Sequence, residues 1–169
     1  MSLYDVTVPA FIKVLNNLNH ILDKTAKNAE TRKFETEVLM NARLAPDQFN
    51  FIRQVQIACD TAKLCASRLT GKDAPVNDDK EKTLEELKAR INQTISYLRD
   101  FSATDFTGSE DKKISQPRWE GIWLTGTEFA TQHALPNIYF HVTTAYSILR
   151  HNGVDIGKKD YLGEMPYKK

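Results

Sequence analysis

The stretch of sequence that decides the fold lies in the C-terminal third, where residues 135–153 read LPNIYFHVTTAYSILRHNG. Its apolar residues recur every three or four positions, which is the period of an α-helix with one buried face. This stripe consists of Leu135, Ile138, Val142, Ala145 and Leu149. Pro136 lacks a backbone donor, so it should kink or restart the helix. We predict a helix over about residues 127–152, and its further apolar residues make it the segment expected to be most buried.

Three earlier segments show the same periodicity and predict three more helices. They cover about residues 9–29, 46–70 and 83–101. Pro9 suits the first turn of a helix. Thr83 and Glu86 form a capping box at the start of another. Four helices with short links predict an all-α fold, an antiparallel four-helix bundle in a single domain over residues 1–169.

The helix predicted over residues 46–70 has two apolar faces. One face is a heptad-like stripe that includes Cys59. The other holds Phe49, Ile57 and Leu64. We expect this second face to pack on the connection at residues 34–44 or on another subunit.

Two connections carry predictions of their own. Residues 29–46 form a long link that would let the first two helices cross from one end of the bundle to the other. Residues 102–126 break the helical pattern, and a short β-hairpin is predicted there between the third and fourth helices. Trp119 and Trp123 lie in this hairpin, where they either cover one end of the bundle or wall a ligand pocket.

The composition limits the classes of function. The 169 residues are 41% hydrophobic and carry 23 basic against 22 acidic side chains, a net charge of +1. Because basic and acidic side chains are nearly equal in number, the chain has no strong electrostatic field that would favour binding to nucleic acid or to an anionic membrane. We expect neither a signal peptide nor a membrane span, since no stretch of about 20 apolar residues occurs. Cys59 and Cys65 would lie about 9 Å apart along a helix, beyond disulfide reach, so reduced thiols and a cytoplasmic location are expected.

The histidines of the last segment are spaced too widely for a shared metal ion. His133, His141 and His151 are eight and ten residues apart, a rise of about 12 and 15 Å on a helix. Metal–nitrogen bonds are about 2 Å long, so two of these side chains cannot easily hold one ion. We predict no metal site and no cofactor, with a weakly held divalent metal as the alternative.

His141 is the most informative of these residues. It lies at the edge of the predicted stripe, and Asn137 lies on the same flank of the helix. The ring is either a half-buried structural group bonded to a neighbour, or a ligand or acid–base contact in a pocket.

Asp60 offers a carboxylate on the border of the stripe in the helix over residues 46–70. It either pairs with Arg53, Lys63 or His141, or forms the acidic wall of a pocket. One carboxylate and one histidine suffice for proton transfer but are too few ligands for a tight metal site. The candidate ligand-binding residues are Gln56, Asp60, Trp123, Asn137, His141 and Tyr146.

Three stretches of the chain resemble a known family. They are LYDVTVPAFIKVLNNL, NARLAPDQFNFIRQVQIACDTAK and LPNIYFHVTTAYSILRHNGVDIGKKDYLG. They look like the bacterial family of unknown function DUF1993, which is regarded as related to the DinB/YfiT-like superfamily. The resemblance implies a four-helix bundle, often dimeric. Many superfamily members bind a divalent metal through three histidines, one on the second helix and two four residues apart on the last, and some are thiol-dependent transferases or hydrolases.

The chain departs from that three-histidine pattern. Cys59 or Asp60 stands near the position expected for the histidine of the second helix, and Ala145 follows His141 by four residues. We therefore predict a DinB-like bundle that lacks the intact metal site and binds a small molecule. The alternative is an enzyme with a remodelled or weak metal site that uses Asp60 and His141. A homodimer through Ile57 and Leu64 is compatible with either.

Overall fold

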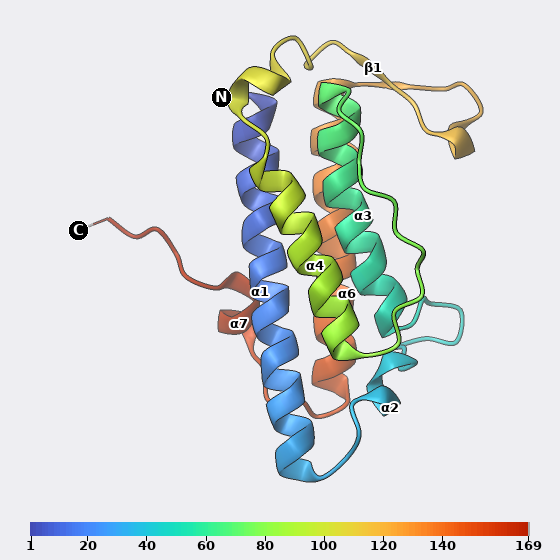
Figure 1. Ribbon diagram of the computed structural model, residues 1–169, viewed down its shortest axis with the longest axis vertical. Coiled ribbons are helices and arrows are strands. Elements are labelled where there is room, and N and C mark those ends of the chain that lie inside the picture. Colours follow the sequence, from blue (N-terminus) through green and yellow to red (C-terminus); the bar gives the residue numbers. More distant parts are fainter. Residues whose placement is uncertain (169) are drawn as a thin grey trace.

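The computed structural model describes residues 1–168 and consists of four long helices packed around a shared core (Figure 1). These helices are α1 (Leu3–Arg32), α3 (Phe51–Thr70), α4 (Leu84–Arg99) and α6 (Leu135–His151). The stripes predicted from the sequence are buried in the core, as with Phe11, Leu15, Leu18, Val55, Cys59, Leu87, Ile91, Ile138, Val142 and Leu149. The predicted all-α four-helix bundle is confirmed.

The order of helix directions differs from the predicted antiparallel one. In Figure 1, α1 and α6 run in one direction, whereas α3 and α4 both run in the other. Because α3 and α4 are parallel, residues 71–83 between them must return along the length of the bundle (Figure 1). The prediction that residues 29–46 make the lengthwise crossing was therefore wrong.

The connection between α1 and α3 stays at one end of the bundle for local reasons. α1 continues to Arg32 and α3 begins only at Phe51, and the short helix α2 (Glu37–Met40) takes up part of the link between them. The backbone N–H of Phe51 then donates to the carbonyl oxygen of Ala42, which closes the loop before α3 starts.

The first helix also begins earlier than predicted. Ser2 and Asp5 form a capping box in which each side chain accepts the backbone N–H of the other residue, so α1 starts at Leu3. Pro9 consequently lies inside α1 and not at its first turn.

The last helical segment is built of three continuous pieces. α5 (Gly126–Glu128) passes into a π-helical turn, η3 (Phe129–Ala134), which passes into α6. Pro136 lies in the first turn of α6, where the π-helical turn changes to an α-helix without a break in the helical run. The wider π turn accommodates the backbone carbonyl that proline leaves without a donor.

Burial in α6 is lower than expected. Phe140 is 56% and Tyr139 is 40% exposed, so one side of α6 faces solvent. α3 is the helix that packs on both sides, against α4 and α6. The apolar character of α6 therefore does not make it the innermost helix.

The predicted hairpin is present between α4 and α6. β1 (Lys113–Ile114) pairs antiparallel with β2 (Leu124–Thr125), and η2 (Pro117–Trp119) forms a 3-10 turn between them. A further 3-10 turn, η1 (Ala103–Phe106), leads from α4 toward β1. The hairpin extends from the end of the bundle at which α6 begins (Figure 1).

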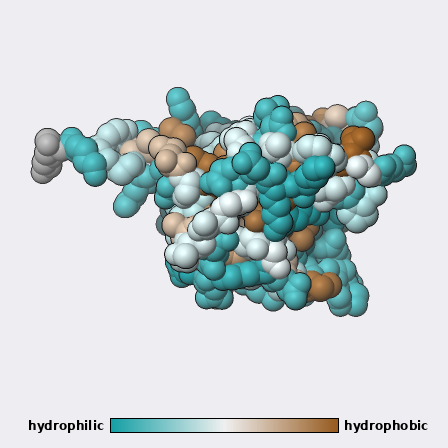
Figure 2. Space-filling model, turned by 90° about the horizontal axis from the view of Figure 1, so that it is seen from above, coloured by the Kyte–Doolittle hydropathy of each residue, from teal (hydrophilic) through white to brown (hydrophobic). Residues whose placement is uncertain are grey.

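The surface at that end of the bundle is mostly hydrophilic. Figure 2 shows hydrophobic residues there in small separate groups between polar ones. No helix within residues 1–168 is both long enough and apolar enough to cross a membrane. After α6, the short helix α7 (Lys158–Leu162) packs against α1.

Candidate functional site

A cavity of about 290 Å³ lies between α3 and α6, beneath residues of the hairpin. Phe49 and one face of α3 form one wall of the cavity. The other wall comes from η3 and α6, where lining residues recur every four positions, as with Phe129, His133, Asn137 and His141. The lining consists of Phe49, Arg53, Ile57, Asp60, Thr61, Leu64, Arg68, Gln116, Arg118, Phe129, His133, Ala134, Asn137 and His141. This α3–α6 cavity has both apolar and polar walls.

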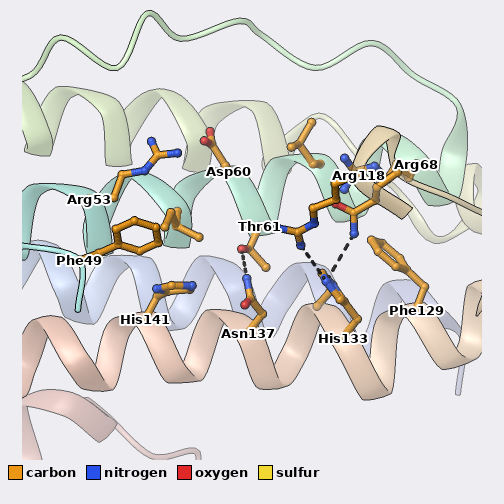
Figure 3. A pocket seen from close by; sticks show the side chains of 14 residues that line it. Phe49, Arg53, Asp60, Thr61, Arg68, Arg118, Phe129, His133, Asn137 and His141 are labelled. Carbon is orange, nitrogen blue, oxygen red and sulfur yellow. Dashed lines mark hydrogen bonds between the residues drawn. The ribbon is translucent and has the colours of Figure 1, made fainter. Parts of the chain in front are cut away.

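A hydrogen bond crosses the middle of the α3–α6 cavity. Asn137 Nδ2 donates to Thr61 Oγ1 over 2.7 Å. His141 lies on one side of this bond and His133 on the other, as Figure 3 shows. The bond therefore separates a His141 end, near Arg53, from a His133 end, near Arg68.

At the His141 end, the histidine is buried and neutral. His141 Nδ1 lies 2.7 Å from Gln54 Oε1, and Gln54 Nε2 donates to the carbonyl oxygen of Phe49 over 2.9 Å. The second bond fixes the amide of Gln54 so that its oxygen faces His141, which assigns the ring proton to Nδ1. Burial, and then the nearby charge of Arg53, lower the pKa of His141 to about 4. At neutral pH the ring thus carries no charge, and Nε2 is its basic nitrogen.

At the His133 end, two donors reach the same ring nitrogen. Gln116 Nε2 lies 3.4 Å and Arg118 Nη2 lies 3.3 Å from His133 Nε2. The ring stacks on Phe129 with centroids 5.3 Å apart, and Trp119 meets it edge-on. Burial, and then the charges of Arg118 and Arg68, keep the pKa of His133 below its ordinary value. A neutral imidazole that accepts a hydrogen bond at Nε2 fits this surrounding.

Asp60 turns toward α4 and does not pair with His141. Its Oδ1 accepts from Arg90 over 2.8 Å and lies 3.0 Å from Lys63 Nζ. Of the partners proposed from the sequence, Lys63 is therefore correct, and Arg90 was missed because it lies on α4. Gln56 belongs to the same region: it is buried and donates to Glu81 over 2.8 Å.

The family now follows from comparison with known proteins. The family model described as domain of unknown function (DUF1993) matches residues 3–162, nearly the whole chain. The chain belongs to the DUF1993 family. A solved structure from Shewanella denitrificans, described as a DinB family member, is 60% identical, with a TM-score of 0.96 over 99% of this chain and 95% of that one. No curated protein matches.

This DUF1993 chain is thus related to DinB-like proteins, and its donor set can be compared with the three-histidine metal site of that superfamily. Four residues before His141 stands an amide, Asn137, and four after it stands Ala145. Asp60 is already bound by two cations. Within residues 1–168, no group of three or more His, Cys, Asp or Glu side chains converges as metal ligands. The residues present do not fit a three-histidine ion site.

The two thiols of this DUF1993 chain are buried in the core. Cys59 and Cys65 are both free and fully buried. Burial raises the pKa of each thiol to about 12, so neither is a thiolate at neutral pH.

Three of the candidate site residues, Gln56, Tyr146 and Trp123, lie away from the α3–α6 cavity. Tyr146 packs edge-on against Tyr161 of α7, with ring centroids 6.1 Å apart. Trp123 is 47% exposed on the hairpin, with Lys113 Nζ 4.5 Å from the centre of its ring. Tyr146 is turned toward α7 and Trp123 toward solvent, so neither side chain lines the cavity, whereas Asp60, Asn137 and His141 do.

Several lining residues were not predicted in this DUF1993 chain. Ile57 and Leu64 were assigned to an outer contact face of α3, but they line the α3–α6 cavity. The four-residue spacing of Phe49, Arg53 and Ile57 was the signal that one face of α3 looks into a shared space. Arg118 gave no such signal, because only the folded hairpin brings it over the helices.

Proposed function

We propose that this protein binds a small organic molecule in the α3–α6 cavity and does so without a tightly held metal ion. The observation that carries the proposal is the combination of an apolar wall with polar groups that converge on one space. Phe49, Ile57 and Leu64 supply apolar surface, while Asn137 and His133 supply polar contacts. Small-molecule sites have this composition, and about 290 Å³ is near the lower end of their size range.

A ligand titration tests this proposal. ¹H–¹⁵N NMR spectra would be recorded with benzamide and with benzoate, whose single ring suits a cavity of this size. We expect saturable shifts at Thr61, Leu64 and Asn137 with a Kd of about 1 mM or below for at least one compound. No saturable shift with either compound would overturn the proposal.

A variant that fills the cavity provides the matched control. Leu64→Trp adds a large side chain to the cavity wall, and we expect it to raise the Kd at least about tenfold. Val76→Trp places the same side chain at a position that is 89% exposed, outside the cavity, and should leave the Kd unchanged. Equal binding by both variants would place the compound elsewhere.

The alternative, an enzyme with a weak metal site formed by Asp60 and His141, is less well supported. Arg90 and Lys63 bind the carboxylate of Asp60, and Gln54 binds His141. Metal analysis after incubation with zinc or nickel separates the two functions. We expect well under one ion per chain, and a stoichiometric ion lost in Asp60→Asn would favour the enzyme.

Association of two copies and a cytoplasmic location are further proposals. A homodimer formed through Ile57 and Leu64 would bury two residues that line the α3–α6 cavity. Light scattering tests this directly: a particle of 19.3 kDa is a monomer, and Leu64→Glu should dissociate a true dimer. The two reduced thiols favour the cytoplasm.

A further inference from the structure

Two arginines, Arg68 and Arg118, line the His133 end of the cavity. Within residues 1–168, no carboxylate lies within 4.0 Å of Arg68 or Arg118. Arg68 is partly buried, with its guanidinium 5.8 Å from the centre of the Phe129 ring. Burial, and then the charge of Arg118, lower the pKa of Arg68, so the two cations are close enough to repel.

Hydrogen-bond donors outnumber acceptors at this end. Gln116 and Arg118 both approach His133 Nε2, and a neutral imidazole nitrogen has one lone pair to accept with. Arg68 adds a second guanidinium among the residues that line this end of the cavity. An acceptor with several lone pairs and a negative charge would satisfy these donors.

The other charged residues of the α3–α6 cavity are already neutralised. Arg53 donates to Asp79 over 2.6 Å. Asp60, the one carboxylate among the lining residues, is paired with Arg90 and Lys63. The uncompensated positive charge is therefore confined to the His133 end.

We propose that the His133 end of the cavity binds the acidic group of an organic anion, a carboxylate or a phosphate monoester, between Arg68 and Arg118. The apolar part of the anion lies along Phe129 and Leu64, toward the middle of the cavity. This inference rests on the proposed small-molecule function and assigns the class of ligand to it. The planar guanidinium fork suits both acidic groups, because each offers paired oxygen acceptors.

His133 couples this binding to pH. The charged groups that face it are Arg118 from η2 and Arg68 from α3, and both oppose its protonation. A bound anion offsets these charges, so the imidazole takes up a proton more readily and Nε2–H can then donate to the anion. Affinity for an anion should therefore increase as the pH falls from 7.5 to about 6, and His133→Gln should abolish that increase.

Three probes of similar shape test the proposal by NMR titration: benzoate, phenyl phosphate and benzamide. We expect at least one of the two anions to bind about tenfold more tightly than benzamide. The double variant Arg68→Gln, Arg118→Gln should remove this preference, so that the Kd values for the anions and for benzamide differ by less than about twofold. Arg150→Gln removes an exposed arginine at the far end of α6 and should change none of the three.

The outcomes separate this inference from the proposed function. If benzamide binds in the cavity as tightly as both anions, the anion site is excluded and the small-molecule function stands. If the anions are preferred but the double variant keeps that preference, the acidic group binds elsewhere and the inference is again overturned. If none of the three probes binds, both proposals fail. A preference for phenyl phosphate or for benzoate identifies which acidic group the site takes.

Discussion

The two sides of α3 use arginine in opposite ways. On the side of α4, Arg90 is buried and bonded to Asp60, Asp79 and Glu81, a group that we name the Arg90 cluster. On the side of α6, Arg68 faces the α3–α6 cavity without a carboxylate within 4.0 Å among residues 1–168. A buried charge needs paired groups, and Arg90 has three carboxylates within salt-bridge distance, so we assign the Arg90 cluster a structural role. On the side of α6, a ligand can supply the negative charge that residues 1–168 do not place near Arg68.

The Arg90 cluster also explains why residues 71–83 follow the bundle. Asp79 and Glu81 lie in this connection, and both bind Nη1 of Arg90. Burial raises the pKa of Glu81, but the hydrogen bonds from Arg90 and Gln56 outweigh it and leave the pKa below its ordinary value. The connection is thereby attached to α3 and α4 along its path.

The largest effect is expected from removal of the cluster's cation. Arg90→Ala leaves three carboxylates without their shared partner, and we expect a loss of about 3–5 kcal/mol in the free energy of unfolding, measured by urea denaturation. Arg150→Ala removes a surface arginine whose nearest carboxylate is 4.0 Å away, and it should cost less than about 0.5 kcal/mol. If Arg90→Ala unfolds the chain, Arg90→Lys provides an intermediate value. Equal effects of the Arg90 and Arg150 variants would remove the contrast between the two sides of α3.

The second effect concerns the buried His141 and its dependence on pH. Its pKa is about 4 in the folded protein against 6.5 in the unfolded chain, so the unfolded chain binds more protons between these values. The contribution of His141 to the free energy of unfolding is therefore fully present above about pH 6.5, and it is lost as the pH decreases toward 4. The pKa difference corresponds to roughly 3 kcal/mol over the whole window.

Urea denaturation between pH 7.5 and pH 4.5 measures this contribution. His141→Gln keeps a donor for Gln54 but does not titrate, so its stability should fall less steeply with acid than that of the natural chain. The exposed His151, changed to Gln, should leave the profile as it is. A His141→Gln profile parallel to the natural one would show that His141 is not held neutral by burial.

Local periodicity predicts most of the fold but not the Arg90 cluster. Helical spacing is a property of each segment alone, which is why α3, α4 and α6 were found from the sequence. The connection over residues 71–83, which joins the parallel helices α3 and α4 and contacts Arg90 through Asp79 and Glu81, is polar and shows no periodic pattern in the sequence.

The site was only half predictable for the same reason. His141 and Asn137 were found because they share one helix flank, and both line the α3–α6 cavity. Asp60 was placed correctly on the edge of the α3 stripe, but the direction of its side chain depended on Arg90, a residue 30 positions away. Arg118 reaches the cavity only because the hairpin folds over α3 and α6.

A smaller effect on stability is expected from removal of the hydrogen bond that crosses the cavity. Thr61→Val removes the acceptor of Asn137 Nδ2 and leaves that partly buried donor without a partner, so we expect a loss of about 1 kcal/mol. Thr143→Val breaks an exposed hydrogen bond to Tyr161 and should change stability by less than about 0.5 kcal/mol. Urea denaturation of both variants makes the comparison. A Thr61→Val protein as stable as the natural one would mean that water replaces Thr61 and that the cavity is open along its middle.

The smallest effect on stability should come from Arg68, which is partly buried, whereas Arg90 is buried. Arg68→Met keeps the apolar stem over Phe129 and removes a charge that has lost hydration and lies near Arg118. Among residues 1–168 this charge has no carboxylate partner within 4.0 Å. We therefore expect the free energy of unfolding to stay within about 0.5 kcal/mol of the natural value, or to rise slightly. Urea denaturation at low and at high salt checks this, because relief of repulsion between the two cations should be greatest at low salt. A loss of 2 kcal/mol or more, about the size expected for a charge with a structural partner, would mean that Arg68 is satisfied within the fold and that the two sides of α3 do not differ in the way proposed.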